Sequence, residues 1–534
     1  MSVTLLITAI IIIICIILNK LSSKLGIPML LGFILLGMFF GSDGIVKIPF
    51  ENYAFAEQIC SIALIFIMFY GGFGTSWKEA KPVAVKAVLL STLGVVMTSG
   101  LTGIFCHYIL KIDWLESLLV GAVIGSTDAA SVFSILRAKR LNLKYNTASL
   151  LEVESGSNDP CSYMLTAIII SVINGNAHGK SLVYMVFSQV VYGIALGIVI
   201  ALAAVWAMKK INFSTDGFDT VFVVAAALFA YSAPAALGGN GYLSVYIVGI
   251  VLGNARLKNK TNLVHFFDGV TGLMQMLVFF LLGLLSFPSR LPQVFLPALA
   301  IALFLTFIAR PVSIFAILSP FKSNVSQELV VSWAGLRGAA SIVFAIMAVM
   351  QVNTKNDIFH IVFCIVLFSI LLQGSLLPLV SRKLDMLDSN GDVMKTFTDY
   401  MDEVPVQFIQ SSIHSGHSWC GRNLSDILMP PDTIAALLKR GAEKIVPNGS
   451  TVLAEGDKLI LCAKSPAQVE GVFLSERELK GDDHWIGKTL FELPEMNGKL
   501  IIMIMRDDKI IIPRGDTVLE ENDVLVINNT EQEE

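Results

Sequence analysis

The chain has 534 residues, of which 54% are hydrophobic and only 15% are charged. Soluble domains carry roughly 25% charged residues, so this composition excludes a purely soluble protein and predicts that much of the surface faces lipid. The formal net charge of -4 argues against a nucleic-acid partner, and the seven cysteines show neither a disulfide framework nor metal-ligand spacing.

Apolar runs long enough to cross a bilayer as helices, about 20 residues each, follow one another from the N-terminus to residue 383. The first run lacks a basic flank and a cleavage site, so we expect a retained span and not a signal peptide. We predict thirteen spans, at residues 3–19, 27–41, 57–73, 83–110, 115–136, 148–173, 181–208, 217–235, 240–255, 264–287, 295–318, 326–350 and 357–381. The expected fold is therefore an all-α membrane domain.

The positive charges in the loops predict the orientation of these spans. With the N-terminus outside, the cytoplasmic loops hold 16 Lys and Arg residues and the outer loops hold 5. This alternation supports an odd number of spans, because one missing helix would scramble it. We therefore expect a multi-pass protein of the cell membrane, in contact with lipid, whose C-terminal tail is cytoplasmic.

The fifth predicted span carries an acidic side chain among small residues, in the segment GAVIGSTDAASVF at 121–133. An ionisable group at mid-membrane costs at least ~2.5 kcal/mol and is a functional candidate by default. Small residues suit a broken helix whose freed carbonyls coordinate a cation, here around Thr127 and Asp128. A tight helix-packing face would also explain the small residues, but it would not explain Asp128.

The sixth predicted span contains the segment LEVESGSNDP at 151–160. Ser155 and Asp159 are four residues apart and share one helix face, and Glu154 and Asn158 share another. Glu154 and Asp159 lie about 140° apart around the helix, so we expect them to do different jobs. We assign Asp159 to the transported ion and Glu154 to a buried partner. Proline at the next position loosens the turn before it.

Two arginines lie inside predicted spans of the second half of the membrane domain. Arg310 precedes a proline in LTFIARPVS, and Arg337 lies in WAGLRGAASIVF. A buried cation offsets the cost of burying a carboxylate or the carbonyl end of a broken helix. We therefore expect each arginine to neutralise one or the other, and Asp128 to face Arg337.

The two halves of the membrane domain share the pattern G-x-x-x-A-A-S, which begins at Gly125 and again at Gly335. These segments fall in the fifth and twelfth predicted spans. Two inverted six-span repeats around the seventh span would make them equivalent. Interrupted helices at matching places in inverted repeats mark the binding site of a transporter, and a chance match of four small residues is the alternative.

After residue 384, short β-branched runs alternate with turn residues, which is typical of small sheets. Motifs that begin at Trp419 and Pro447 recur at Trp485 and Pro513, both 66 residues later. One shared offset predicts two tandem copies of a small α+β module. We divide the chain into a membrane domain at 1–383, a linker at 384–403 and regulatory modules at 404–470 and 471–534.

The motifs GSTDAASVF, LEVESGSNDP and GLRGAAS resemble those of the monovalent cation:proton antiporter-1 family, in particular its NhaP-type bacterial members. The resemblance covers nearly all of residues 1–383. It implies thirteen helices with inverted repeats, a homodimer, and a crossing of two unwound helices. It also implies that Asp159 alternately holds the cation and the proton, with Asn158 as its paired asparagine.

The same resemblance implies the other residues of the site. They are Thr127 through its carbonyl, Asp128 and Ser155 as cation ligands, Glu154 and Arg310 as a structural ion pair, and Arg337 as the charge of the second unwound helix. Members of this family often carry an acidic residue in the third span, where this chain has Tyr70.

The tail resembles the C-terminal subdomain of regulators of potassium conductance (TrkA-C), in tandem. That module binds small ligands in related transporters, including cyclic di-adenosine monophosphate in some bacteria. The resemblance implies regulation by such a ligand and names none of its residues. We expect no other cofactor and no resident metal.

Together these features predict an antiporter that exchanges K⁺ or Na⁺ for protons, with K⁺ favoured by the pairing of core and tail. A single titrating carboxylate, Asp159, predicts electroneutral exchange. One alternative is a ligand-gated cation channel, but no carbonyl filter such as TVGYG is present. A membrane-anchored sensor is the other alternative, and the intramembrane charges argue against it. No enzyme motif is found, so we expect no enzymatic activity.

Overall fold

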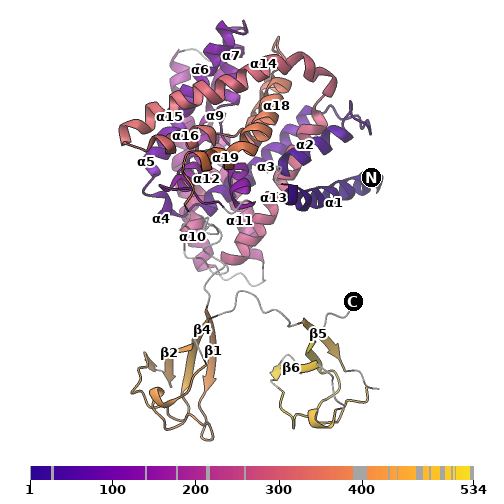
Figure 1. The fold of residues 1–534 in the computed structure, drawn as a ribbon, viewed down its shortest axis with the longest axis vertical. Helices are drawn as coiled ribbons and strands as arrows, with labels where there is room; N and C mark the ends of the chain where they lie inside the picture. Colours follow the sequence, from indigo (N-terminus) through magenta and orange to yellow (C-terminus); the bar gives the residue numbers. More distant parts are fainter. Residues whose placement is uncertain are drawn as a thin grey trace. The chain divides into compact units, whose positions relative to one another are not determined.

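The computed structural model describes residues 2–25, 29–138, 141–175, 179–211, 217–255, 257, 260–388, 406–430, 433–441, 443–464, 473–479, 481, 483–493, 499–506, 509–511 and 513–529 (Figure 1). It divides into two compact units, Met1–Asp402 and Glu403–Glu534. The first is helical and the second holds two small sheets.

The helices of the first unit correspond in order to the predicted spans, which confirms the helical membrane fold. They are α1 (Ser2–Leu25), α2 (Met29–Phe40), α3 (Tyr53–Gly74), α4 (Trp77–Ala80), α5 (Ala84–Leu89), α6 (Val95–Tyr108), α7 (Trp114–Val123), α8 (Ala129–Ala138), α9 (Thr147–Ile173), α10 (Gly179–Lys210), α11 (Phe218–Ala236), α12 (Gly241–Asn254), α13 (Lys260–Leu285), α14 (Leu291–Phe304), α15 (Arg310–Leu318), α16 (Val325–Trp333), α17 (Ala339–Gln351), α18 (Ile358–Phe368) and α19 (Ser375–Lys383). Within the described residues, seven helical stretches are long and apolar enough to cross a membrane uninterrupted.

Three spans pass through a π-helical segment that joins two α-helices. These segments are η1 (Leu90–Gly94) between α5 and α6, η3 (Leu305–Ala309) between α14 and α15, and η5 (Ser369–Gly374) between α18 and α19. The first two lie in the fourth and eleventh spans, again seven apart. Because π-segments are rare and cluster at functional sites, their matching positions support the inverted repeats.

Contacts sort the helices into two groups. The first group holds α1 to α3 and α10 to α13, where α3 packs on α12 and α13, and α2 packs along α13 (Figure 1). The second group holds α5 to α9 and α14 to α19, where α7 packs on α6 and α9, and α14 packs on α18. The two groups meet where α9 and α17 touch α3 and α12.

The first residues of the predicted linker pack against the membrane unit. Leu387 forms an antiparallel bridge with Leu143, and the Lys144 amide donates to the Met386 carbonyl at 2.9 Å. Met386 is fully buried, and Asp385 pairs with Lys144 at 3.0 Å. Residues 385–388, which follow α19, therefore hold the loop between α8 and α9 in place, and we call this contact the clamp. This contact could not be predicted from hydrophobic periodicity, because a single buried Met386 forms no repeating pattern.

The second unit contains two four-stranded antiparallel sheets of the same topology. The first has the order β1-β4-β2-β3 and the second the order β5-β8-β6-β7. Their strands are β1 (Val406–Ser412), β2 (Thr433–Arg440), β3 (Glu443–Ile445), β4 (Lys458–Lys464), β5 (Phe473–Glu478), β6 (Lys499–Arg506), β7 (Lys509–Ile511) and β8 (Val524–Asn529). The register shifts between Ala435 and Leu437 in one sheet and between Ile501 and Met503 in the other, 66 residues later. The internal repeat is thus a structural repeat.

Each sheet is fastened by an equivalent arginine–aspartate pair. Arg440 donates to both oxygens of Asp457, at 2.8 and 2.7 Å, and Arg506 donates to both oxygens of Asp523, at 2.7 Å each. The two aspartates are fully buried. The hydrogen bonds from Arg440 hold the pKa of Asp457 below its ordinary value of 3.8. Such two-pronged pairs are stronger than single charged contacts.

Replacing Arg440 with methionine is expected to destabilise the first sheet by about 2 kcal/mol, less than a fully buried pair because solvent screens half-exposed Arg440. The wild-type stabilisation is complete above pH about 4 and is lost as the pH falls through the lowered pKa of Asp457. Hydrogen exchange of β4 in the full-length protein measures the change, and β8 of the unaltered sheet is the control. Equal hydrogen exchange of β4 in the wild type and in the Arg440→Met variant would contradict this prediction.

Candidate ion-binding site

Two helices of the second group are broken at the same depth and cross there. Non-helical chain joins α7 to α8 at residues 124–128 and α16 to α17 at residues 334–338. The Asp128 amide donates to the Leu336 carbonyl at 2.8 Å, and the Ser126 and Ser341 hydroxyls lie 3.3 Å apart. The predicted crossing of unwound helices in the fifth and twelfth spans is therefore present.

Arg337 neutralises the broken end of the first crossing segment. Its guanidinium donates to the carbonyls of Gly125 and Ser126 at 3.0 and 2.6 Å, and its own amide donates to the Ser369 hydroxyl at 2.9 Å. The side chain is only 1% exposed. Since freed carbonyls in an apolar interior need donors, this arginine holds the crossing together. These contacts go to the carbonyls next to Asp128, one of the two kinds of partner that the sequence allowed for this arginine.

The glycines of the second crossing segment are required by close contacts. A Cβ added to Gly338 would lie 2.3 Å from Asp128 Oδ2 and 2.4 Å from its Cβ, and one added to Gly335 would lie 2.7 Å from Arg310 Nε. Real Cβ atoms do not approach other atoms so closely. The pattern G-L-R-G therefore leaves room for one acidic and one basic side chain.

Side chains of α9 attach to Thr127 in the first crossing segment. The Ser155 hydroxyl donates to the Thr127 carbonyl at 2.7 Å, and the Asn158 amide nitrogen donates to the Thr127 hydroxyl at 2.5 Å. Asn158 is completely buried and does not line the cavity described below, although it was predicted as an ion ligand. Its hydrogen bond fixes the position of the Thr127 side chain.

Asp159 is buried and has one oxygen available. The residue is 9% exposed, and its Oδ1 has no hydrogen-bond partner within the described residues. Asp128 lies across from it, with Oδ2 accepting from the Ser131 hydroxyl at 2.5 Å. A buried carboxylate oxygen without a donor is expensive unless a proton or a cation occupies it.

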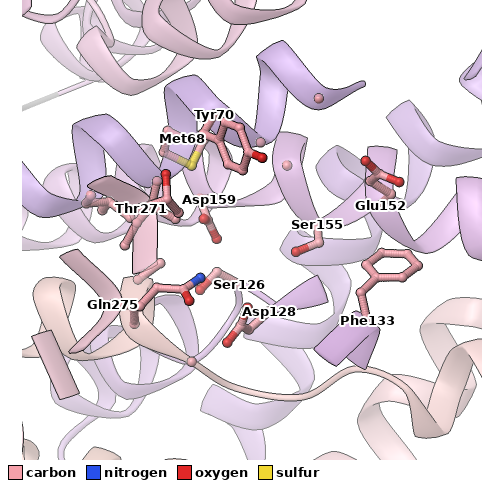
Figure 2. Close-up of a pocket in the computed structure, with 18 of the residues that line it drawn as sticks. Met68, Tyr70, Ser126, Asp128, Phe133, Glu152, Ser155, Asp159, Thr271 and Gln275 are labelled. Carbon is pink, nitrogen blue, oxygen red and sulfur yellow. The ribbon is translucent and has the colours of Figure 1, made fainter. Parts of the chain in front are cut away.

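Both aspartates face a cavity of about 390 Å³ between the two helix groups (Figure 2). One wall comes from α3 and α13 of the first group, with Tyr70, Thr271 and Gln275. The other wall comes from the crossing segments and from α8 and α9 of the second group. The predicted site residues that line the cavity are Thr127, Asp128, Ser155 and Asp159.

Glu154 points away from the cavity and pairs with Arg310. Their Oε1 and Nη2 atoms are 2.6 Å apart, and the side chains are 0% and 3% exposed. Glu154 and Asp159 thus occupy different faces of α9, as their spacing predicted. The pair links α9 to α15, which lie in the sixth and eleventh predicted spans and thus in different predicted repeats.

Two acidic residues of the cavity wall were not predicted from the sequence. Glu152 lies on α9, one turn before Ser155, and Asp268 lies on α13. The Tyr70 hydroxyl donates to Asp268 Oδ1 at 3.1 Å. The signal that would have found them is an acidic residue inside an apolar helix, but both lie near a span end, where solvation is the ordinary expectation.

Comparison with known proteins places this site in a family. Residues 9–383 match the transmembrane sodium/hydrogen exchanger family, and residues 408–469 and 474–528 each match the TrkA-C domain. The K(+)/H(+) antiporter NhaP2 of Shewanella sp. (strain MR-4) is 34% identical over 484 residues, which is 88% of this chain and 83% of the relative. The K(+)/H(+) antiporter NhaP of Alkalimonas amylolytica is 37% identical over 394 residues, 73% of this chain and 68% of the relative.

A more distant relative and a solved structure are also named as sodium/proton antiporters. The Na(+)/H(+) antiporter ApNhaP of Aphanothece halophytica is 28% identical over 358 residues, 62% of this chain and 65% of the relative. The sodium proton antiporter MjNhaP1 of Methanocaldococcus jannaschii matches with a TM-score of 0.63 and 23% identity, over 72% of this chain and 99% of its own, which shows a shared fold. The chain therefore belongs to the sodium/hydrogen exchanger family.

Proposed function

We propose that this chain is an antiporter that exchanges a monovalent cation for protons across the cell membrane, with K⁺ favoured and Na⁺ as the second candidate. The observation that carries the proposal is Asp159 of α9, a buried carboxylate beside the crossing of two broken helices, whose Oδ1 has no hydrogen-bond partner among the residues that the structure describes. The relatives named K(+)/H(+) antiporters, at 34–37% identity, favour K⁺.

The chemistry at this site is competition for one carboxylate. A cation in the cavity would find oxygens of Asp159 and Asp128, the Ser155 hydroxyl and the Thr127 carbonyl. A proton on Asp159 removes the charge that holds the cation, so loading one expels the other. The cavity lies between two helix groups, and movement of one group against the other would change the side from which Asp159 is reached. One titrating carboxylate gives one proton per cation, hence electroneutral exchange.

Orientation and assembly belong to the same proposal. The loop charges, 16 against 5, favour an outer N-terminus and a cytoplasmic tail. On this orientation the cavity lies toward the cytoplasmic ends of α3, α9 and α13. The homodimer implied by the family resemblance is part of this proposal.

The alternatives find less support. The relatives are named as antiporters, which does not favour a ligand-gated channel. Anchoring alone does not require a buried carboxylate such as Asp159 in the membrane, so a membrane-anchored sensor does not explain this cavity. Neither the motifs nor the relatives suggest an enzyme, so transport is the proposed activity.

The direct test uses everted membrane vesicles that contain the protein and a pH-sensitive dye. Adding K⁺, Na⁺ or Li⁺ in turn is expected to dequench the dye, with K⁺ effective at the lowest concentration. The Asp159→Asn variant, shown to be folded and inserted, is expected to give no signal with any of the three. Uptake or release of the cation by the same vesicles without any dequenching of the dye would support the channel instead.

We also propose that the tail regulates exchange by binding a small ligand, with cyclic di-adenosine monophosphate as the first candidate, and that the chain divides into a membrane domain, a linker and two TrkA-C-like modules. The clamp formed by residues 385–388 supports this coupling. It holds the loop that joins α8 to α9, and both helices line the cavity. A conformational change that ligand binding causes in the tail would be transmitted to the site through that loop.

Replacing Met386 with serine is expected to loosen this clamp and to reduce the response of exchange to the ligand by about half or more, because a buried apolar contact is lost. The measurement is dye dequenching in vesicles with and without cyclic di-adenosine monophosphate. Asp385→Ala is the matched control, since its exposed ion pair contributes little. An unchanged ligand response in Met386→Ser would remove the clamp from the regulatory path.

A further inference from the structure

The cavity wall opposite Asp159 carries a polar stripe of its own. On α13, Asp268, Thr271 and Gln275 are spaced by three and four residues, so they share one helix face, and all three line the cavity. Figure 2 shows Thr271 and Gln275 on the side of the cavity across from Ser155 and Glu152. From Phe266 to the end of α13 at Leu285, these three are the only polar side chains, so packing alone does not explain a polar face here.

Thr271 is the observation that points to a ligand. It is 7% exposed, and its hydroxyl has no hydrogen-bond partner within the described residues, although it lines the cavity. A buried hydroxyl without a partner costs free energy unless water or an ion contacts it. One helical turn away, Tyr70 of α3 donates to Asp268 Oδ1 at 3.1 Å and so holds this carboxylate at the cavity wall.

Asp268 lies closer than Asp159 to the end of the helix bundle at which α9 and α13 begin, which we take as the mouth of the cavity. Asp268 is eight residues from the start of α13, about 12 Å, whereas Asp159 is twelve residues from the start of α9, about 18 Å. The two helices start at the same end of the bundle. There α4 contacts α9, and the Trp77 amide of α4 donates to Asn254, the last residue of α12.

We propose that Asp268, oriented by Tyr70, and Thr271 form a first binding station for the monovalent cation, on the way to Asp159. This inference rests on the proposed function. The carboxylate attracts the cation, and the Thr271 hydroxyl replaces part of its water before it reaches the buried aspartate. Tyr70 thereby acts as a positioning residue, because its hydroxyl holds the carboxylate of Asp268 from another helix.

Asp268→Asn tests the station by kinetics. The cation KM is expected to rise roughly five- to tenfold with a nearly unchanged maximal rate, because an attractive charge is lost but the exchange site is intact. The increase should shrink when choline chloride raises the ionic strength, since salt screens an attraction near the mouth. Tyr70→Phe is expected to show a smaller rise, and Asp268→Glu to restore most of the affinity.

The matched control is Asp219→Asn, an acidic residue in the first turn of α11 that does not line the cavity. Its KM is expected to equal that of the wild type. If Asp268→Asn keeps the wild-type KM at low ionic strength while Asp159→Asn abolishes exchange, the station is wrong and the antiport proposal stands. If Asp268→Asn lowers only the maximal rate, its role is structural and the station is again wrong.

Discussion

The Arg310→Met variant is expected to lower the free energy of unfolding of the membrane domain by about 3–5 kcal/mol, because it leaves Glu154 as a fully buried carboxylate without its cation. In the wild type their atoms are 2.6 Å apart, and neither side chain reaches solvent appreciably. The melting temperature of the detergent-solubilised protein measures the loss. Exchange should fall with the amount of folded protein.

A second variant separates a structural role from a transport role. The Arg310→Met, Glu154→Gln double variant removes both charges and is expected to recover much of the lost stability and to retain exchange, since neither group lines the cavity. If the double variant is stable but inactive, the pair belongs to the transport machinery. If Arg310→Met melts like the wild type, the pair does not stabilise the fold.

Gly338→Ala is expected to reduce exchange by about a hundredfold, the cost typical of a displacement of about 1 Å in a preorganised site. The new methyl group would lie 2.3 Å from Asp128 Oδ2 and 2.4 Å from Asp128 Cβ. Rotation of the carboxylate relieves only the first contact. The second requires the crossing to open, and that crossing is fixed by the hydrogen bond from the Asp128 amide to Leu336.

The control for this change is Gly100→Ala in α6, where an added Cβ meets no atom within 4 Å. Both variants place alanine in the second helix group, so a general effect of the substitution would appear in both. Exchange rates normalised to folded protein in vesicles decide the matter. A Gly338→Ala protein with wild-type exchange would show that the crossing tolerates a side chain there.

Much of this architecture follows from local patterns in the sequence. The thirteen apolar runs, the two broken helices and the 66-residue repeat all rest on periodicity, length or small-residue composition, which depend on neighbours along the chain. The separation of Glu154 from Asp159 also follows from helical geometry alone. These features are recovered because lipid leaves the backbone so few choices.

Features that depend on which helices meet could not be predicted in this way. Asp268 reaches the cavity only because α13 packs against α3, and the face of a membrane helix that meets water is invisible in an apolar sequence. Asn158 turns toward the Thr127 hydroxyl because the crossing brings that group within reach. The sequence left a carboxylate and a broken-helix carbonyl end as the two kinds of partner for Arg337, and the fold brings the Gly125 and Ser126 carbonyls of a distant helix within its reach. Each depends on a contact between residues far apart in the sequence.

The most direct test of a single shared carboxylate is the pH dependence of the cation KM in reconstituted vesicles. If a proton and a cation compete for Asp159, the KM rises in proportion to the proton concentration at low pH, and saturating cation restores the full maximal rate. A KM that stays constant while the maximal rate falls with pH would mean that proton and cation bind at separate places, and that Asp159 does not alternate between them.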